Sequence, residues 1–240
     1  MDKWPFRARA CARVLGVAFA IVGIVGFANA DSDAPYVEVA HAAQVTEDRQ
    51  LAAQKEMGAL PGRHEPEDKC GTDPLDQRCG VWELAVDLLP DVPGLERVRV
   101  SASEGLALFD ANNKLIARNE DGLSPGSLSA VGELSAGQVI PDADLELVWS
   151  YDDGGRNSGS SGVDVFKRRG TELVRVFTGD SREWQDVRAG GTEQTGKVTL
   201  SAKGVIRYRA PGTKRATTWH WDATTFRFVK EVSQNLHRFN

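Results

Sequence analysis

The chain has 240 residues, of which 41% are hydrophobic and 26% are charged, and its 34 acidic and 29 basic side chains give a net charge of −5. This acidic balance argues against nucleic acid and anionic lipid as the main partner, because binding to phosphate needs clustered positive charge. The length fits one large domain or two small ones. No combination of residues along the chain forms a recognisable catalytic motif.

The first thirty residues have the pattern of a secretory signal peptide. Four basic residues come first, and the apolar run VLGVAFAIVGIVGF follows at residues 14–27. Ala28 and Ala30 then provide small residues at a cleavage site. This run of 14 residues is shorter than the roughly 20 that a membrane span requires. We therefore expect a signal peptide over residues 1–30, no membrane span in the mature protein and a periplasmic or secreted bacterial product. An uncleaved anchor is the alternative.

Cysteine usage agrees with export. Cys11 precedes the apolar run and leaves with the signal peptide, so it is not a lipid-anchored cysteine. Cys70 and Cys79 remain, separated by eight residues, and two cysteines in an oxidising compartment predict one disulfide bond. A redox pair would have only two residues between its cysteines. A zinc site that uses the acidic and histidine side chains of residues 64–68 is the alternative.

Residues 31–69 differ in composition from the rest of the chain. Residues 37–60 are rich in Ala, Gln and Glu, which favours a helix. Most of the apolar positions are alanine, so such a helix buries little surface, and Pro61-Gly62 ends it. We expect a helical or flexible N-terminal arm and linker over residues 31–69, with a helix that docks on a partner as the functional alternative.

Residues 70–240 are predicted to form a β-rich repeat domain. Short runs of β-branched and aromatic residues alternate there with Gly, Asp, Asn and Pro, which is typical of strands and tight turns. In Trp219-His220-Trp221 both indoles lie on one face of a strand. We expect these indoles to pack in the core, and a ligand platform is the alternative. The strand-like runs are residues 107–109, 115–116, 146–149, 163–166, 173–177, 198–200, 205–208, 217–219 and 226–229.

The β-rich part contains an internal repeat. The sequence LERV at residues 95–98 recurs as LELV at residues 145–148, each time after an acidic, turn-forming stretch and before a hairpin. Phe109, Phe166 and Trp221 occupy corresponding places in three such hairpins. Small antiparallel units of this kind bury their apolar faces against copies of themselves. The sequence therefore predicts a mostly β fold of antiparallel hairpin repeats, either propeller-like or an irregular β-sandwich.

These units resemble the FG-GAP or VCBS type of extracellular β-propeller repeat. Residues 93–98 and 144–148 are similar to the strand of that repeat, and Asp142 and Asp144 are similar to its Asp-rich turn. In the family this turn is a calcium loop. Asp142, Asp144 and Glu146 alternate along the chain and offer oxygen ligands of the kind that Ca²⁺ prefers. They are the candidate metal ligands, a solvated turn is the alternative, and we expect no other cofactor.

The most distinctive mature segment is YDDGGRNSGSSG at residues 151–162. It is polar and rich in glycine, and we expect a loop between two strands, because loops on a rigid β scaffold often bind partners. A plain hairpin connection is the alternative. The segment matches neither a nucleophile elbow nor a phosphate loop. The candidate binding residues are Asp152, Asp153, Arg156, Asn157 and Ser158.

Together these features predict an exported, non-enzymatic binding protein whose partner is a protein of the cell envelope. An inhibitor or immunity-type protein that acts on an envelope enzyme fits this description. Cleavage after Ala30 would leave 25 basic and 33 acidic side chains, a net charge of −8, which suits a basic partner. The alternative is an envelope hydrolase with Asp142, Asp144, Asp152 and Asp153 as its acids.

Overall fold

The computed structural model describes six segments of the chain, and residues 33–240 form one compact unit. The predicted signal peptide and both mature cysteines lie outside the described residues, so cleavage and the disulfide bond stay predictions. No helix within the described segments is long and apolar enough to cross a membrane. The described segments are residues 34–58, 81–101, 105–119, 131–154, 158–185 and 190–232.

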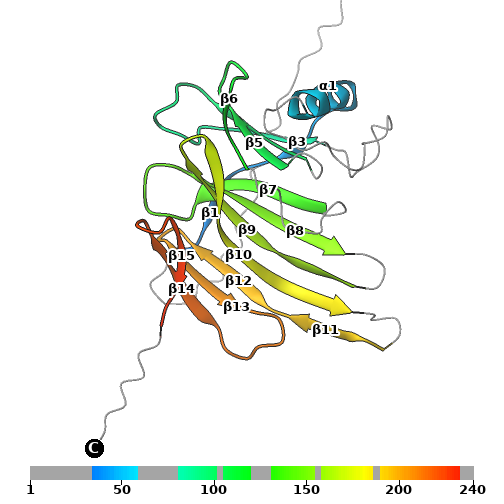
Figure 1. Ribbon diagram of the computed structural model, residues 1–240, viewed down its shortest axis with the longest axis vertical. Helices are drawn as coiled ribbons and strands as arrows, with labels where there is room; N and C mark the ends of the chain where they lie inside the picture. The colour runs from blue at the N-terminus through cyan, green and yellow to red at the C-terminus, as the bar shows by residue number, and fades with distance from the viewer. Residues whose placement is uncertain are drawn as a thin grey trace, which may run out of the picture. The chain divides into compact units, whose positions relative to one another are not determined.

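The predicted mostly β class with antiparallel hairpins is confirmed (Figure 1). In the described residues the chain forms fifteen strands and one helix. They are β1 (Val37–His41), β2 (Ala43–Gln44), α1 (Glu47–Gly58), β3 (Val81–Val86), β4 (Glu96–Ser101), β5 (Gly105–Phe109), β6 (Leu115–Arg118), β7 (Val131–Gln138), β8 (Glu146–Gly154), β9 (Ser158–Arg169), β10 (Glu172–Gln185), β11 (Thr192–Thr195), β12 (Lys197–Ser201), β13 (Val205–Arg209), β14 (Thr217–Asp222) and β15 (Arg227–Lys230).

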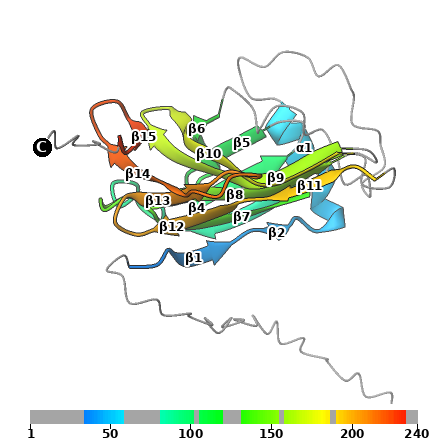
Figure 2. The same cartoon turned by 90° about the horizontal axis from the view of Figure 1, so that it is seen from below.

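Eleven strands form one sheet that closes into a nearly complete barrel. The order is β1-β7-β8-β9-β10-β6-β5-β4-β3-β2, and β11 pairs with the far end of β10. Only Ala42 separates β1 from β2, and the two follow one another along one side of the barrel (Figure 2). Because β1 pairs with β7 and β2 pairs with β3, this one segment joins the two ends of the sheet. On the opposite side β6 and β10 meet through a single parallel pair, Arg118 with Glu172.

The barrel wall consists of two four-stranded halves, β3–β6 and β7–β10. In each half the first two strands are joined by a loop that leads into a buried glutamate, Glu96 or Glu146. The loops touch, since the Leu145 N–H donates to the Leu88 carbonyl at 3.1 Å. The internal repeat of the sequence therefore corresponds to half of a barrel.

Side chains fill the barrel, as expected for one of about eight wall strands. All eight wall strands contribute to a single buried apolar cluster. Leu88 and Leu89, from the loop between β3 and β4, also belong to this cluster. The interior is therefore a packed core. The largest fully buried apolar side chains of this cluster are Leu88, Leu89, Leu106, Leu108, Leu134, Leu147, Phe166 and Leu173.

The strands β12, β13, β14 and β15 form a second antiparallel sheet that packs against the outside of β8–β10. Phe177 of β10 lies at the centre of this contact, with its ring edge-on to Tyr208, Trp219 and Phe228 at centroid distances of 5.9, 5.9 and 6.1 Å. Trp219 and Trp221 both pack against this apolar layer and are half-buried there, in agreement with the expected packing of the two indoles.

The N-terminal arm differs from the helix predicted over residues 37–60. Residues 37–44 are strands, and the helix is confined to α1. The cause is tertiary. Pro35 bridges to Ser201 of β12, β1 pairs with β7, and β2 pairs with β3. Three strand edges thus offer hydrogen bonds that outweigh a weak helical preference.

The helix α1 covers the outside of the first half of the wall. Met57 packs against Ala107 and Phe109 of β5, and both α1 and β5 contact the almost fully buried Arg99. Arg99 pairs with Glu56 of α1 and lies 5.0 Å from the centroid of the Phe109 ring. One half of the barrel is therefore covered by a helix and the other by a sheet.

The side chain of Tyr36, directly before β1, allows the pairing of β1 with β7 to be tested by measuring stability against pH. Its hydroxyl lies 3.0 Å from Ser135 Oγ on β7, and burial raises the pKa of Tyr36 to about 12. A group whose pKa is raised on folding stabilises the fold fully below its unfolded pKa, here about 10. That contribution is lost as the pH rises towards the folded value.

We expect Tyr36→Phe to lower the free energy of unfolding by about 1 kcal/mol at neutral pH, because the hydrogen bond to Ser135 is lost. Between about pH 10 and pH 12 the difference from the parent protein should shrink or reverse, since phenylalanine does not ionise. Urea unfolding of both proteins across this range measures the change. A difference that stays constant from neutral to alkaline pH would contradict the burial of this hydroxyl.

Candidate functional site

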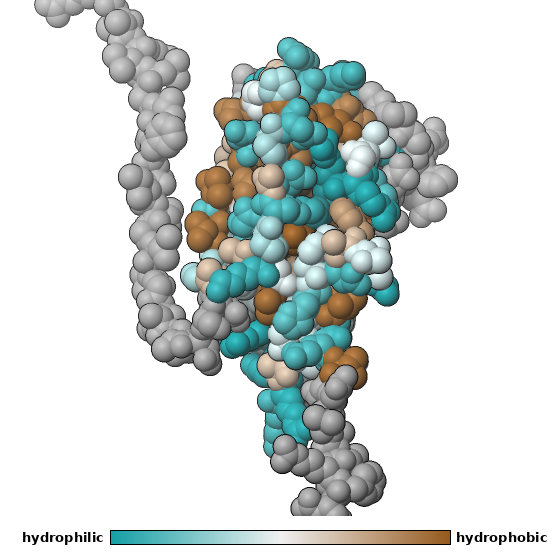
Figure 3. All heavy atoms as spheres, turned by 90° about the vertical axis from the view of Figure 1, so that its left-hand side faces the viewer, coloured by the Kyte–Doolittle hydropathy of each residue, from teal (hydrophilic) through white to brown (hydrophobic). Residues whose placement is uncertain are grey.

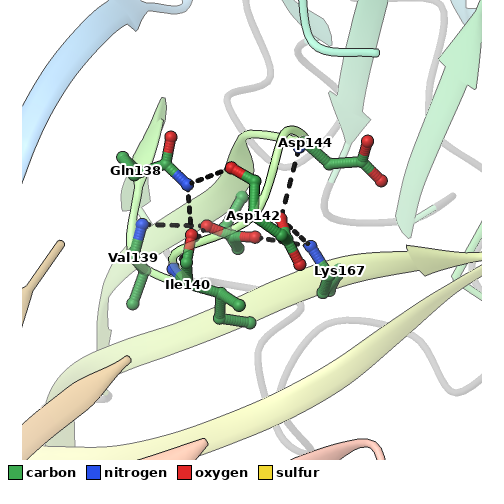
Figure 4. Close-up of polar contacts among 7 residues, drawn as sticks. Gln138, Val139, Ile140, Asp142, Asp144 and Lys167 are labelled. Carbon is green, nitrogen blue, oxygen red and sulfur yellow. Dashed lines mark hydrogen bonds and ion pairs between the residues drawn. The ribbon is translucent and has the colours of Figure 1, made fainter. Parts of the chain in front are cut away.

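Two of the three predicted calcium ligands, Asp142 and Glu146, pair with a lysine, Lys167 (Figure 4). The Glu146 side chain is fully buried, and its Oε2 accepts the Val139 and Ile140 N–H groups at 2.8 and 2.9 Å. Its Oε1 accepts a hydrogen bond from Lys167 Nζ at 2.8 Å, and Lys167 also donates to Asp142 Oδ1 at 3.0 Å. The chain itself therefore supplies the cation for these two carboxylates.

Asp144 does not join this group. Its N–H donates to Asp142 Oδ1 at 3.2 Å, and its carboxylate points away from Lys167 (Figure 4). Within the described segments, no three His, Cys, Asp or Glu side chains come together in a way that could hold a metal ion. The geometry of Asp142, Asp144 and Glu146 thus favours a structural ion pair over the predicted calcium site.

Charge pairing keeps Lys167 protonated. Burial acts to lower the pKa of Lys167, but the Glu146 and Asp142 carboxylates outweigh it and hold the pKa above its usual value. The protonated amine is what lets Glu146 lie fully buried, because an unpaired buried carboxylate is costly.

The first half of the barrel repeats this motif. Glu96 is also fully buried, and its Oε2 accepts the Leu88 and Leu89 N–H groups at 2.6 and 3.3 Å. Asp91, in the same loop, pairs with Arg168 at 2.9 Å, next to Lys167 on β9. We call each of these arrangements a glutamate clasp, since a carboxylate holds the backbone of the preceding loop. The clasps fix the loops, so their role is structural.

The predicted binding loop is shorter than expected. The strands β8 and β9 stay paired up to Gly154 and Gly159, so Asp152 and Asp153 belong to β8 and Ser158 begins β9. The physical reason is that β10 runs alongside and pairs with the end of β9, which gives the Gly/Ser segment a strand partner. Asp152 and Ser158 are exposed, and the predicted residues Arg156 and Asn157 lie outside the described segments.

Four strand ends meet here. Ser158–Ser161 of β9 pair with Arg182–Gln185 of β10, which pair in turn with β11. We call this group, with Asp152–Gly154 of β8, the tip sheet. Its outer strand β11 is exposed along its whole length.

Arg182 and Trp184 are the residues of the tip sheet that the sequence analysis missed. Arg182 Nε donates to Glu193 Oε1 at 2.8 Å, and the guanidinium lies 4.8 Å from the Trp184 ring centroid. Gly159 stands opposite Trp184 in the ladder and has no side chain to cover the indole. The two-residue spacing of Arg182 and Trp184 was the available signal, since it places both side chains on one face of a strand.

The acids predicted for a hydrolase are divided between two places. Asp142 lies before the start of β8, whereas Asp152 lies near its end. The six residue-to-residue steps from Glu146 to Asp152 span about 20 Å at a rise of roughly 3.3 Å per residue. Paired carboxylates of glycosidases are about 5–10 Å apart, so acids from the two ends of β8 do not form such a pair.

The barrel interior holds two further carboxylates. Tyr151 donates to Asp180 Oδ1 at 2.8 Å, and its ring passes over Gly162, where any Cβ would collide with it. Asp164 is fully buried and lies 3.3 Å from the Arg175 guanidinium. Both acids have partners, and the burial of Asp164 keeps it from any substrate, so this pair is part of the core.

Large exposed apolar side chains are few among the described residues: Val37, Val39, Leu95 and Val232. On the face that Figure 3 presents, apolar residues are scattered among hydrophilic ones. A broad apolar interface or membrane-binding surface would instead show a continuous patch. The surface residues that can bind a partner on this face are therefore mostly polar.

No protein-family model, curated protein or solved structure matches the chain. The resemblance to FG-GAP or VCBS repeats therefore stays a prediction. Any functional conclusion has to come from the residues themselves.

The clasp of the second half can be tested by mutation. We expect Lys167→Met to lower the free energy of unfolding by about 3–5 kcal/mol, because it leaves Glu146 buried without a counter-charge. The double variant Glu146→Gln/Lys167→Met should recover part of this loss, since the amide oxygen can still accept from Val139 and Ile140. Urea unfolding of the four proteins of this cycle gives the coupling energy. Purely additive losses would show that the two side chains do not form a buried pair.

Proposed function

We propose that the protein is an exported, non-enzymatic binding protein that recognises a protein of the cell envelope through the tip sheet. The observation that carries this proposal is the half-exposed Arg182–Trp184 pair on the tip sheet, next to exposed Asp152 and Ser158. Tryptophan and arginine are the residues that most often dominate the binding energy of protein interfaces.

The surroundings of this pair support a binding role. The neighbouring strand segment Ser158–Ser161 contains only serine and glycine, so its side chains are much smaller than that of Trp184 beside it. Within the described residues the only strand that pairs with β11 is β10. The Arg209 guanidinium already donates to the Thr195 carbonyl at 3.0 Å, so the outer edge offers backbone groups of Thr192–Gln194 to a partner. Open strand edges of this kind bind extended segments by β-augmentation.

Charge favours a basic partner, such as an envelope enzyme that the protein inhibits. Asp152, Glu183 and Glu193 are all exposed on the tip sheet. Arg182 is the one basic residue among the sheet's own described residues, and the Arg209 guanidinium contacts the sheet at the Thr195 carbonyl. Complementary charge raises the rate of association and selects the partner.

The signal pattern of residues 1–30 supports export. The proposed location is therefore periplasmic or secreted, with cleavage after Ala30.

Site-specific crosslinking tests the proposed surface. We expect a photoreactive residue at Ser158 to capture one envelope protein, identified by mass spectrometry. The same residue at Asp87, which is exposed at the other end of the barrel wall, should not capture it. Capture from Asp87 alone would place the interface elsewhere, and the absence of a specific product from both positions would oppose a protein partner.

Binding to the captured partner is then measured with variants. We expect Trp184→Ala to weaken the affinity about thirtyfold, as the loss of a central aromatic contact of about 2 kcal/mol predicts. Asp152→Lys should slow association with a basic partner, whereas the charge-matched control Asp87→Lys should not. Unchanged affinity in Trp184→Ala, with its stability also unchanged, would refute the tip sheet as the interface.

A further inference from the structure

A second candidate site lies on the other side of β10, away from the tip sheet. A groove of about 480 Å³ runs between residues 175–178 of β10 and residues 227–230 of β15. Its volume lies within the range of about 300–1,000 Å³ that is typical of small-molecule sites. Because four consecutive residues of each strand line the groove, it runs along the length of β10 and β15.

The floor of the groove is aromatic. Phe177 and Phe228 are almost fully buried there, and Trp219 is half-buried beside them. Trp219 Nε1 donates to Thr217 Oγ1 at 3.0 Å, so its one polar atom is satisfied within the protein. What the indole offers to the groove is therefore apolar surface.

The charged residues that line the groove are cations. Arg175, Arg227 and Lys230 belong to it, and its described lining contains no carboxylate, although the whole chain has more acidic than basic residues. Arg175 forms an ion pair with the buried Asp164 of β9, at 3.3 Å. Arg227 and Lys230 are exposed, and their side chains form no ion pair or hydrogen bond with other described residues.

The nearest acids along the second sheet are occupied elsewhere. Asp222 stands opposite Arg227 in the ladder, but its carboxylate accepts the Thr224 N–H at 2.9 Å and the Thr225 hydroxyl at 2.8 Å. Glu231 lies 3.7 Å from His220. Arg227 and Lys230 thus have no dedicated carboxylate partner among the described residues.

We propose that this groove binds a small amphipathic anion, with an apolar body on Phe177, Trp219 and Phe228 and an anionic group paired with Lys230, the ladder partner of Trp219. Arg227 adds positive charge from the other face of β15. An apolar lining with a few placed polar groups is the usual composition of a small-molecule site. The anionic group is a carboxylate or a phosphate, since both pair with guanidinium and ammonium groups. This site is independent of the tip sheet and of its partner.

A series of matched probes tests the proposal. Octanoate, octyl phosphate and octan-1-ol share one apolar chain and differ in the head group. N-acetyl-Phe-Phe and its C-terminal amide provide the same contrast on a peptide, which separates a fatty-acid type of source from a peptide end. Inorganic phosphate lacks the apolar body. Binding is followed by ¹H–¹⁵N NMR, through the indole N–H of Trp219 and the amides of residues 227–230.

We expect at least one of the anionic amphiphiles to shift these signals, and its neutral analogue and inorganic phosphate to bind at least about tenfold more weakly, as expected when about 1.4 kcal/mol is lost. Arg227→Gln/Lys230→Gln should remove this preference for the anion. The control Lys114→Gln/Lys197→Gln has the same net charge, changes two exposed lysines outside the groove and should bind like the parent protein.

Three results would overturn the proposal. The first is equal affinity for anionic and neutral probes. The second is full binding by Arg227→Gln/Lys230→Gln, with a spectrum that shows an intact fold. The third is chemical-shift change confined to residues outside the groove. The tip-sheet experiments use other residues and a protein ligand, so failure of one proposal leaves the other testable.

Discussion

Backbone pairing at the two ends of the barrel sheet is the constraint on which the rest of the structure depends. A strand at the end of a sheet leaves a row of N–H and C=O groups unpaired. Here one short segment pairs first with β12, then with β7 and then with β3. It closes the barrel and ties the second sheet to it. The side chain of Tyr36 belongs to the same junction, because it bonds to Ser135 on β7.

The glutamate clasps provide the second level of order. Each half of the barrel has to turn a loop across its end without leaving amides unsatisfied, and a buried carboxylate accepts two of them at once. The halves then diverge. Glu146 has a lysine partner and Glu96 has none within the described residues, while α1 covers one half and β12–β15 cover the other. The repeat thus accounts for the two similar halves of the barrel wall. The halves differ in what packs on their outer faces, which is α1 on one and the second sheet on the other.

This asymmetry places both candidate binding surfaces on β10. That strand is long enough to pair with β6 at its start and with β11 at its end. Its far end joins β9 and β11 in the tip sheet, and its middle part lines the cationic groove with β15. Apolar side chains of all eight wall strands pack the barrel interior, and both candidate surfaces lie where β10 extends past or beside its neighbours.

The sequence by itself determined the local features: the signal pattern, the strand-rich composition, the LERV/LELV repeat and the inward indoles of Trp219 and Trp221. These depend on composition, alternation and short spacings, which one stretch of chain contains. The tertiary structure decided the rest. Residues 37–41 and 43–44 became strands because distant sheet edges had unpaired backbone groups, Glu146 came to pair with Lys167, and the Gly/Ser loop became paired strand beside Trp184. Each of these outcomes depends on a contact between residues far apart in the chain, and no local pattern encodes which distant residue will be the partner.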